Sequence, residues 1–74
     1  MRVYYDENEN VKVPYMGQMV DEEGVITDLD GTFSRKEWEE IFGGLTYEQA
    51  LEKMGHSEAW IKALKELKEK GIVE

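Results

Sequence analysis

The spacing of the apolar residues changes once along the chain, near Ser34, and this change constrains the fold most. Before Ser34, apolar and polar residues alternate, as in Val11–Val13, which predicts β-strands. After Ser34, apolar residues such as Trp38, Ile41 and Phe42 recur at three- and four-residue spacing, which predicts helices. Strands followed by helices predict an α+β domain, with the helices packed on one face of an antiparallel sheet.

The N-terminal half contains two predicted hairpins, which together give an antiparallel sheet of about four strands. The first hairpin joins Val3–Tyr5 to Val11–Tyr15, and the second joins Gln18–Val20 to Val25–Asp28. Pro14 has no backbone N–H to donate, so we expect its strand to lie at an edge of the sheet or to end there.

The C-terminal half contains two to three short predicted helices. Ser34 with Glu37, and Thr46 with Gln49, have the spacing of capping boxes, and Ser57 is the expected cap of the last helix. A glycine follows the last apolar residue of each helical segment and is expected to end it. The last three residues are then expected to form a short strand or a packed tail.

The length and composition limit the classes of protein to which the chain can belong. Seventy-four residues predict a single α+β domain, residues 1–74, and a hydrophobic content of 41% is enough for a small core. There is no cysteine, which excludes disulfides and thiolate metal sites. No apolar run is long enough for a membrane span or a signal peptide, so we expect a soluble, cytoplasmic protein with no membrane partner.

The net charge of −8 bears on the class of partner. It disfavours nucleic acid, because phosphates require a basic surface. It permits cations or a protein with a basic surface. One hypothesis is therefore an acidic adaptor or inhibitor that binds another protein, with mimicry of nucleic-acid charge as one way of doing so. The alternative is that the charge only keeps a small protein in solution.

The segment Ile26–Glu37 resembles an EF-hand calcium loop, with Gly31 at the sixth of its twelve positions, where that family turns sharply. The family has an Asp at the first position and a helix before it, whereas this chain has Ile26 and a predicted strand. The resemblance implies a strand-loop-helix site for Ca²⁺ or another hard divalent cation, with affinity on the order of 10⁻⁴–10⁻³ M and a structural or sensory role. The implied ligands are Asp28, Asp30, Thr32, Ser34 and Glu37.

Two other interpretations fit the same segment. Val25–Thr32 is similar to the nucleophile motif of haloacid-dehalogenase-type phosphatases, which would make Asp28 the nucleophile and Asp30 the general acid. Only 42 residues follow Thr32, too few for the large parallel sheet of that family, so we expect no enzyme. The segment can also be an ordinary strand, turn and helix cap without any ligand.

Two further segments have sequence patterns that are typical of binding surfaces. Trp60–Val73 resembles the recognition helix of a winged-helix domain, but glutamates interleave with its lysines, so a solvated helix that packs on the sheet is the preferred interpretation. The aromatic and methionine residues of the strand half are expected to belong to the core or, alternatively, to form a protein-binding face. They are Tyr4, Tyr5, Tyr15, Met16 and Met19.

Overall fold

The helices of the computed structural model, which describes all residues from Met1 to Glu74, begin at the predicted caps. They are α1 (Arg35–Phe42), α2 (Tyr47–Lys53) and α3 (Glu58–Glu69). Both capping boxes are present, and the Ser57 hydroxyl accepts a hydrogen bond from the Trp60 amide. The predicted α+β class and the helices are therefore confirmed.

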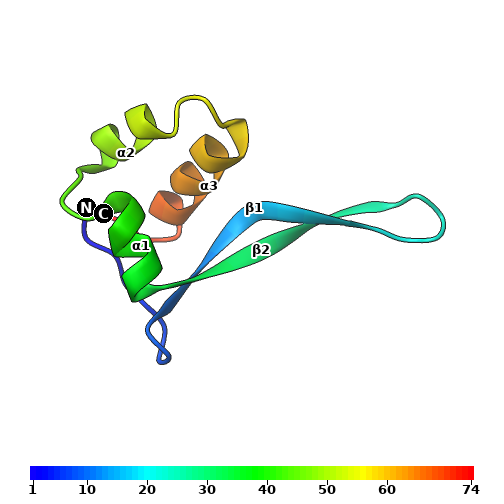
Figure 1. Ribbon diagram of the computed structural model, residues 1–74, viewed down its shortest axis with the longest axis horizontal. Coiled ribbons are helices and arrows are strands. Elements are labelled where there is room, and N and C mark those ends of the chain that lie inside the picture. The colour runs from blue at the N-terminus through cyan, green and yellow to red at the C-terminus, as the bar shows by residue number, and fades with distance from the viewer.

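The prediction of two hairpins and about four strands is wrong. The sheet has two antiparallel strands, β1 (Asn10–Val20) and β2 (Ile26–Ser34), which form one long hairpin (Figure 1). The expected second and third strands are a single strand, because Gly17 continues β1 and does not link two hairpins. The alternating pattern was correct for these residues, but their division into separate strands was not.

The expected first strand, Val3–Tyr5, pairs with the C-terminal tail and not with β1. Val3 forms an isolated antiparallel bridge with Val73, the Tyr4 amide donates to the Ile72 carbonyl at 2.8 Å, and the Glu74 amide donates to the Arg2 carbonyl at 2.9 Å. The two termini consequently lie side by side (Figure 1). Long-range pairing of this kind depends on how the helices return the chain, which local patterns do not encode.

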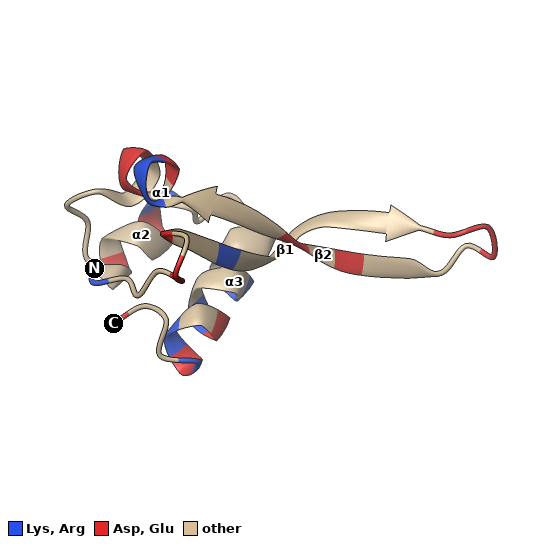
Figure 2. Cartoon of the chain, turned by 90° about the horizontal axis from the view of Figure 1, so that it is seen from below, with Lys and Arg blue, Asp and Glu red and all other residues tan.

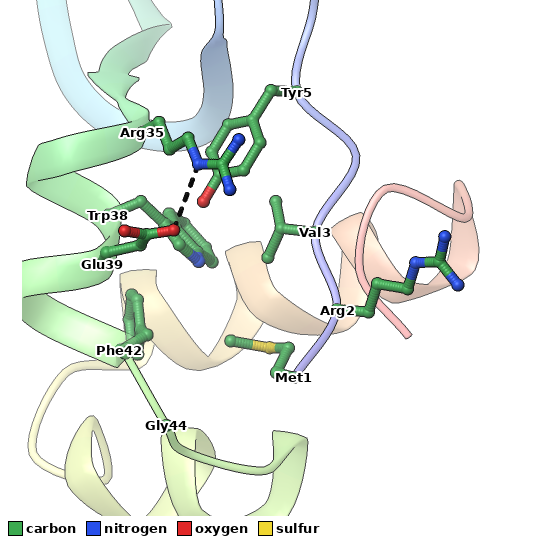
Figure 3. Close-up of a pocket in the computed structure, with 10 residues that line it drawn as sticks. Met1, Arg2, Val3, Tyr5, Arg35, Trp38, Glu39, Phe42 and Gly44 are labelled. Carbon is green, nitrogen blue, oxygen red and sulfur yellow. Dashed lines mark hydrogen bonds and ion pairs between the residues drawn. The ribbon is translucent and has the colours of Figure 1, made fainter.

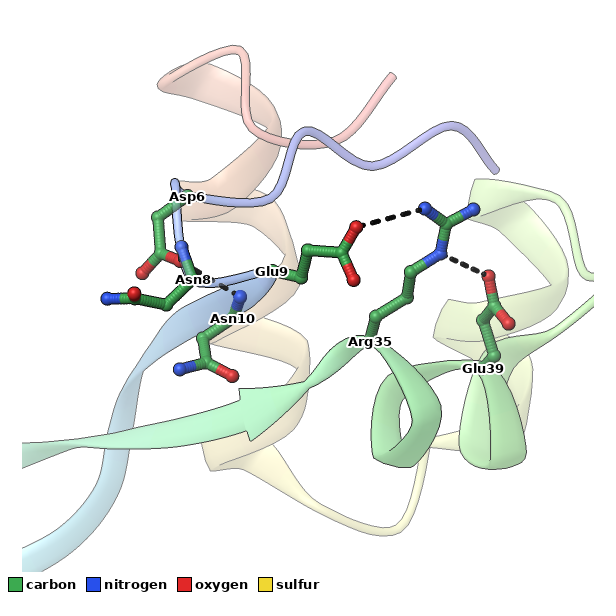
Figure 4. Close-up of polar contacts among 6 residues, drawn as sticks. All are labelled: Asp6, Asn8, Glu9, Asn10, Arg35 and Glu39. Carbon is green, nitrogen blue, oxygen red and sulfur yellow. Dashed lines mark hydrogen bonds and ion pairs between the residues drawn. The ribbon is translucent and has the colours of Figure 1, made fainter.

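The turn before β1 is built by local hydrogen bonds that redirect the chain. One carboxylate oxygen of Asp6 accepts from the amides of Asn8 and Asn10, each at 2.9 Å, and Glu9 adopts a positive φ of 57°. Arg35 ties this turn to α1, since its amide donates to the Glu9 carbonyl and its guanidinium contacts the carboxylates of Glu9 and Glu39 (Figure 4).

A bulge divides the hairpin into two parts. Val13 pairs with Gly31 and Gly17 pairs with Leu29, so three residues of β1 (Pro14–Met16) lie opposite Asp30 alone. A bulge accommodates the missing N–H of Pro14, and it places Tyr15 at a positive φ of 64°. We call Asn10–Val13 with Gly31–Ser34 the proximal half, and Gly17–Asp30 the distal arm.

The hydrophobic core lies between the proximal half and the helices. Two tryptophans and two phenylalanines form its aromatic centre; the Trp38 and Phe42 ring centroids are 4.6 Å apart, and those of Phe33 and Trp60 are 5.5 Å apart. The distal arm contributes no buried residue, and it projects from the body to give a longest dimension of 43 Å against a shortest of 22 Å (Figure 1). The ten buried residues are Val11, Val13, Trp38, Phe42, Ala50, Met54, Ala63, Leu64, Leu67 and Val73.

No helix of the chain combines the length and the apolar character that crossing a membrane would require.

Candidate functional site

The distal arm exposes apolar side chains that a small protein would ordinarily bury. Six large hydrophobic residues of the chain are exposed, and five of them belong to the arm, with between 42% and 62% of their surface accessible. The sixth is Tyr4, on the body of the molecule. Exposed apolar residues that are gathered in one segment, rather than scattered, indicate an interaction surface. The five are Met19, Val20, Val25, Ile26 and Leu29.

Both faces of the arm share this apolar character. Directly opposed residues of an antiparallel pair lie on the same face. Met19 opposite Thr27 and Leu29 opposite Gly17 therefore form one face, and Val20 opposite Ile26 belongs to the other. No helix covers either face of the arm beyond the bulge (Figure 1), so a partner could contact it from both sides.

The arm is also the most one-sided part of the chain in charge. Between Val13 and Ser34 the sequence contains five carboxylates and no Lys or Arg, while all nine basic residues lie elsewhere. Figure 2 shows the acidic residues at the tip of the hairpin and along β2. None of these carboxylates forms an ion pair, because both ion pairs of the structure belong to Arg35. The five are Asp21, Glu22, Glu23, Asp28 and Asp30.

The tip of the arm is held in shape by its own side chains. The Asp21 carboxylate accepts from the amides of Glu23 and Val25, each at 2.9 Å, and Gly24 adopts a positive φ of 83° that glycine tolerates without strain. The Gln18 amide group donates to the Asp28 carboxylate across the strands at 3.2 Å. The arm is thus an ordered hairpin, which lowers the entropy cost of binding.

The root of the arm is fixed to α3 through Tyr15. The Tyr15 hydroxyl donates to the Glu66 carboxylate at 3.3 Å, and the Lys62 ammonium lies 4.5 Å from the centre of the Tyr15 ring. Burial raises the pKa of the Tyr15 phenol above its ordinary value of 10.0, and the charge of Glu66 raises it further. These contacts orient the arm relative to the helices.

The residues of the predicted calcium site are distributed over β2 and the first turn of α1. Asp28, Asp30 and Thr32 lie at alternate positions of β2, an extended strand that rises roughly 3.3 Å per residue, so their backbones are spread along the strand and do not surround one point. Ser34 and Glu37 are engaged with each other in the capping box of α1. No group of three or more acidic or histidine side chains is placed to hold a metal ion.

Gly31 has a different role from the one that the resemblance implies. It does not turn the chain sharply but pairs with Val13 inside the sheet. A Cβ atom at this position would lie 2.7 Å from the Cβ of Met16, so glycine is needed because the bulged strand approaches closely. Calcium binding by this segment stays a prediction, and the strand geometry does not supply a ready site for it.

The other sequence expectations for the strand half divide between core and surface. Tyr5, Tyr15 and Met16 are partly buried and pack against the core, whereas Tyr4 and Met19 are exposed. Sequence reasoning missed the exposed aliphatic residues of the arm, because alternation alone does not say whether a facing layer exists. The absence of any basic residue between Val13 and Ser34 was the available signal.

A cavity of about 640 Å³ lies at the opposite end of the molecule, between the N-terminal segment and α1 (Figure 3). Its wall includes Val3, Trp38 and Phe42. The Arg35 guanidinium in this wall is already paired with Glu39, and Arg2 points away from the cavity. The Met1 ammonium, also at this wall, donates to the Leu45 carbonyl. The charged groups that face the cavity therefore already have partners, and the arm is the stronger candidate.

Comparison of the chain with protein-family models, with curated proteins and with solved structures finds no match.

The four tyrosines give the protein a predictable response to alkaline pH. All four have a phenol pKa raised above 10.0; burial is the largest cause for Tyr5, Tyr15 and Tyr47, and the hydrogen bond to Glu74 is the largest for Tyr4. The folded chain holds these protons more tightly than the unfolded chain. This stabilisation is complete below pH 10 and is lost as the pH rises through the folded pKa values.

We therefore expect the free energy of unfolding to fall above about pH 10. Phenolate absorbance should be titrated in the folded protein and in the urea-unfolded chain, and the folded midpoint should be the higher one. Equal midpoints would contradict the packing described for these side chains, and the Tyr15→Phe variant should reduce the loss of stability.

Proposed function

We propose that the protein is an interaction module that binds a protein with a basic surface through the distal arm, and so acts as an adaptor or inhibitor. The observation that carries this proposal is the concentration of five exposed apolar side chains and five unpaired carboxylates in one segment outside the core. Apolar residues supply contact energy, and complementary charge supplies the rate and specificity of association.

The distal arm does not contribute to the stability of the folded core. Its side chains contribute nothing to the buried core, and an isolated hairpin in water is only marginally stable. An exposed apolar hairpin also invites aggregation, and the acidic residues counteract this by mutual repulsion. The combination is therefore typical of a surface that is kept open for a partner.

The distribution of apolar and acidic residues also distinguishes between kinds of partner surface. A mimic of nucleic acid would present carboxylates without interruption, as phosphates are presented along a duplex. In the arm, apolar residues separate the acidic tip from Asp28 and Asp30. This arrangement favours a partner with an apolar contact area that is rimmed by Lys or Arg.

The test compares three immobilised baits in capture from a lysate of the organism that encodes the chain. The first bait is the wild-type protein. The arm-neutral variant removes the five arm carboxylates: Asp21→Asn, Glu22→Gln, Glu23→Gln, Asp28→Asn and Asp30→Asn. The body-neutral variant removes five exposed carboxylates from the rest of the chain and so has the same net charge: Glu7→Gln, Glu40→Gln, Glu48→Gln, Glu52→Gln and Glu69→Gln.

We expect the wild-type and body-neutral baits to retain the same protein, the arm-neutral bait to lose it, and added salt to release it. Asn at position 21 keeps the oxygen that holds the tip, so the arm should remain ordered. Equal capture by the arm-neutral and wild-type baits would overturn the proposal. Equal loss by both variants would show that only net charge matters and would overturn it too.

A further inference from the structure

The outer edge of β2 carries backbone N–H and C=O groups that have no hydrogen-bond partner within the chain. The sheet has two strands, so one side of β2 faces β1 and the other side faces outward. Two backbone hydrogen bonds next to the paired residues show whether a given N–H or C=O group of β2 faces β1 or the outer edge. Asp21 donates to the Val25 carbonyl, and Arg35 donates to the Glu9 carbonyl.

Bonded and non-bonded pairs alternate along an antiparallel ladder. Val20 and Ile26 form the non-bonded pair next to Asp21 and Val25, and Gln18 and Asp28 form the next one. The N–H and C=O groups of Ile26 and Asp28, and by the same alternation those of Asp30, consequently point to the outer edge of β2.

The two edges of the arm differ in how well they could receive another strand. The edge of β1 is interrupted by Pro14 and by the bulge, and Tyr15 at its root contacts α3. The edge of β2 contains nine residues, Ile26–Ser34, with no proline and no extra residue, a length of roughly 30 Å. The regular edge of β2 is therefore the better template for strand addition.

The side chains along β2 determine what an added strand should carry. Asp28 and Asp30 lie at alternate positions on one face, and Leu29 lies on the other. A residue directly opposite a carboxylate is favoured when it is basic, and one opposite Leu29 is favoured when it is apolar. The matching segment alternates Lys or Arg with apolar residues.

We propose that β2 binds an extended segment of a partner protein, in which basic and apolar residues alternate, as a third strand along Ile26–Asp30. This inference rests on the proposed function and specifies the partner. A second copy of the chain is a poorer occupant, because pairing two β2 edges would bring the Asp28 and Asp30 carboxylates of both copies together.

The probe is a hexapeptide of alternating lysine and valine, acetylated and amidated at its ends. It is added to the full-length, isotope-labelled protein while amide hydrogen exchange is followed by NMR. We expect the peptide to slow exchange of the Ile26 and Asp28 amides on the β2 edge. The Gln18 and Val20 amides, which point to the opposite edge of the arm, are the internal control and should not change.

Two N-methylated peptides separate strand addition from charge attraction. One is methylated on its lysine amides and the other on its valine amides, so both keep the charge and side chains of the parent. A strand added to one edge uses only one of these two sets of amides, so one methylated peptide should lose binding and the other should keep it. A glutamate–valine peptide should not bind.

Removing the carboxylates that face the peptide lysines should weaken binding of the peptide without abolishing it. Asp28→Asn with Asp30→Asn is expected to lower its affinity roughly two- to thirtyfold, from two cross-strand pairs. Glu40→Gln with Glu52→Gln, on the helices, is the matched control and should leave the affinity unchanged within about twofold.

Binding of the parent peptide without protection of the Ile26 and Asp28 amides would overturn strand addition, as would equal binding of both methylated peptides or no binding at all. Protection of these amides in the free protein, together with a dimer in sedimentation, would assign the edge to a second copy and overturn the inference. The capture experiment tests the proposed function independently of these results. Capture depends on the charges of the arm, whereas strand addition depends on backbone pairing.

Discussion

Trp38→Ala is expected to remove a large part of the free energy of unfolding at 25 °C. Trp38 is 2% exposed and packs against Phe42, with its ring centre 6.3 Å from that of Trp60. Truncation of a buried tryptophan costs about 3–5 kcal/mol. A chain of this length has a total stability of roughly 4–11 kcal/mol, so the substitution removes a substantial fraction of it. Far-ultraviolet circular dichroism during urea unfolding measures the loss, and Trp38→Phe should retain more stability.

The matched control for this prediction is Ile26→Ala in the distal arm. It removes a large apolar side chain that is 62% exposed, and we expect the free energy of unfolding to change by no more than about 0.5 kcal/mol. A loss of several kcal/mol from Ile26→Ala would mean that the arm belongs to the folded core. The difference between the two variants measures where the core ends.

Shortening the arm is expected to abolish partner capture and to leave the body folded. The change replaces Gln18–Asp28 with Asn-Gly, so that Gly17 and Leu29, which already pair, flank a two-residue turn of the kind favoured in hairpins. No buried side chain is lost, so the thermal midpoint should move by only a few degrees. The shortened bait should retain none of the protein that the wild-type bait captures.

Two results would contradict this account of the arm. Capture by the shortened bait at the wild-type level would place the binding surface elsewhere on the molecule. A shortened chain that fails to fold would show that the distal pairs support the core. Circular dichroism on the same preparation distinguishes the two outcomes, and the arm-neutral variant provides a binding-deficient protein of full length.

Local signals in the sequence were sufficient for the helical half. Ser34, Thr46 and Ser57 each open a helix where capping chemistry predicts one. These signals operate over three or four residues, so the rest of the fold does not override them. The α+β class followed from the change of apolar spacing, which is also a property of short segments.

The sheet was harder to predict because strand pairing depends on distant residues. Gly17 lies between the two predicted hairpins, where either a link or a bulge fits a glycine. In the structure Gly17 continues β1, and the bulge lies directly before it, at Pro14–Met16. Val3 pairs with Val73, at the other end of the chain, and the sequence around either residue does not indicate this pairing. Alternation identified extended residues without identifying their partners.

The candidate site was partly visible in the sequence. The segment that resembles a calcium loop, Ile26–Glu37, contains two of the arm carboxylates, Asp28 and Asp30. Its glycine suggested a bend, whereas Gly31 serves the close approach of Met16 within the sheet. The exposure of Val20 and Ile26 depends on where the helices end in space, and no pattern within the strands records that.

Native-state amide hydrogen exchange tests the central claim, that the folded core ends at the bulge, most directly. Met19 and Thr27 form a bonded pair in the distal arm, and Val11 and Phe33 form one in the proximal half. We expect Met19 and Thr27 to exchange through local opening at low free energy, and Val11 and Phe33 to exchange only through global unfolding. Equal protection of both pairs, at the free energy of global unfolding, would contradict the claim.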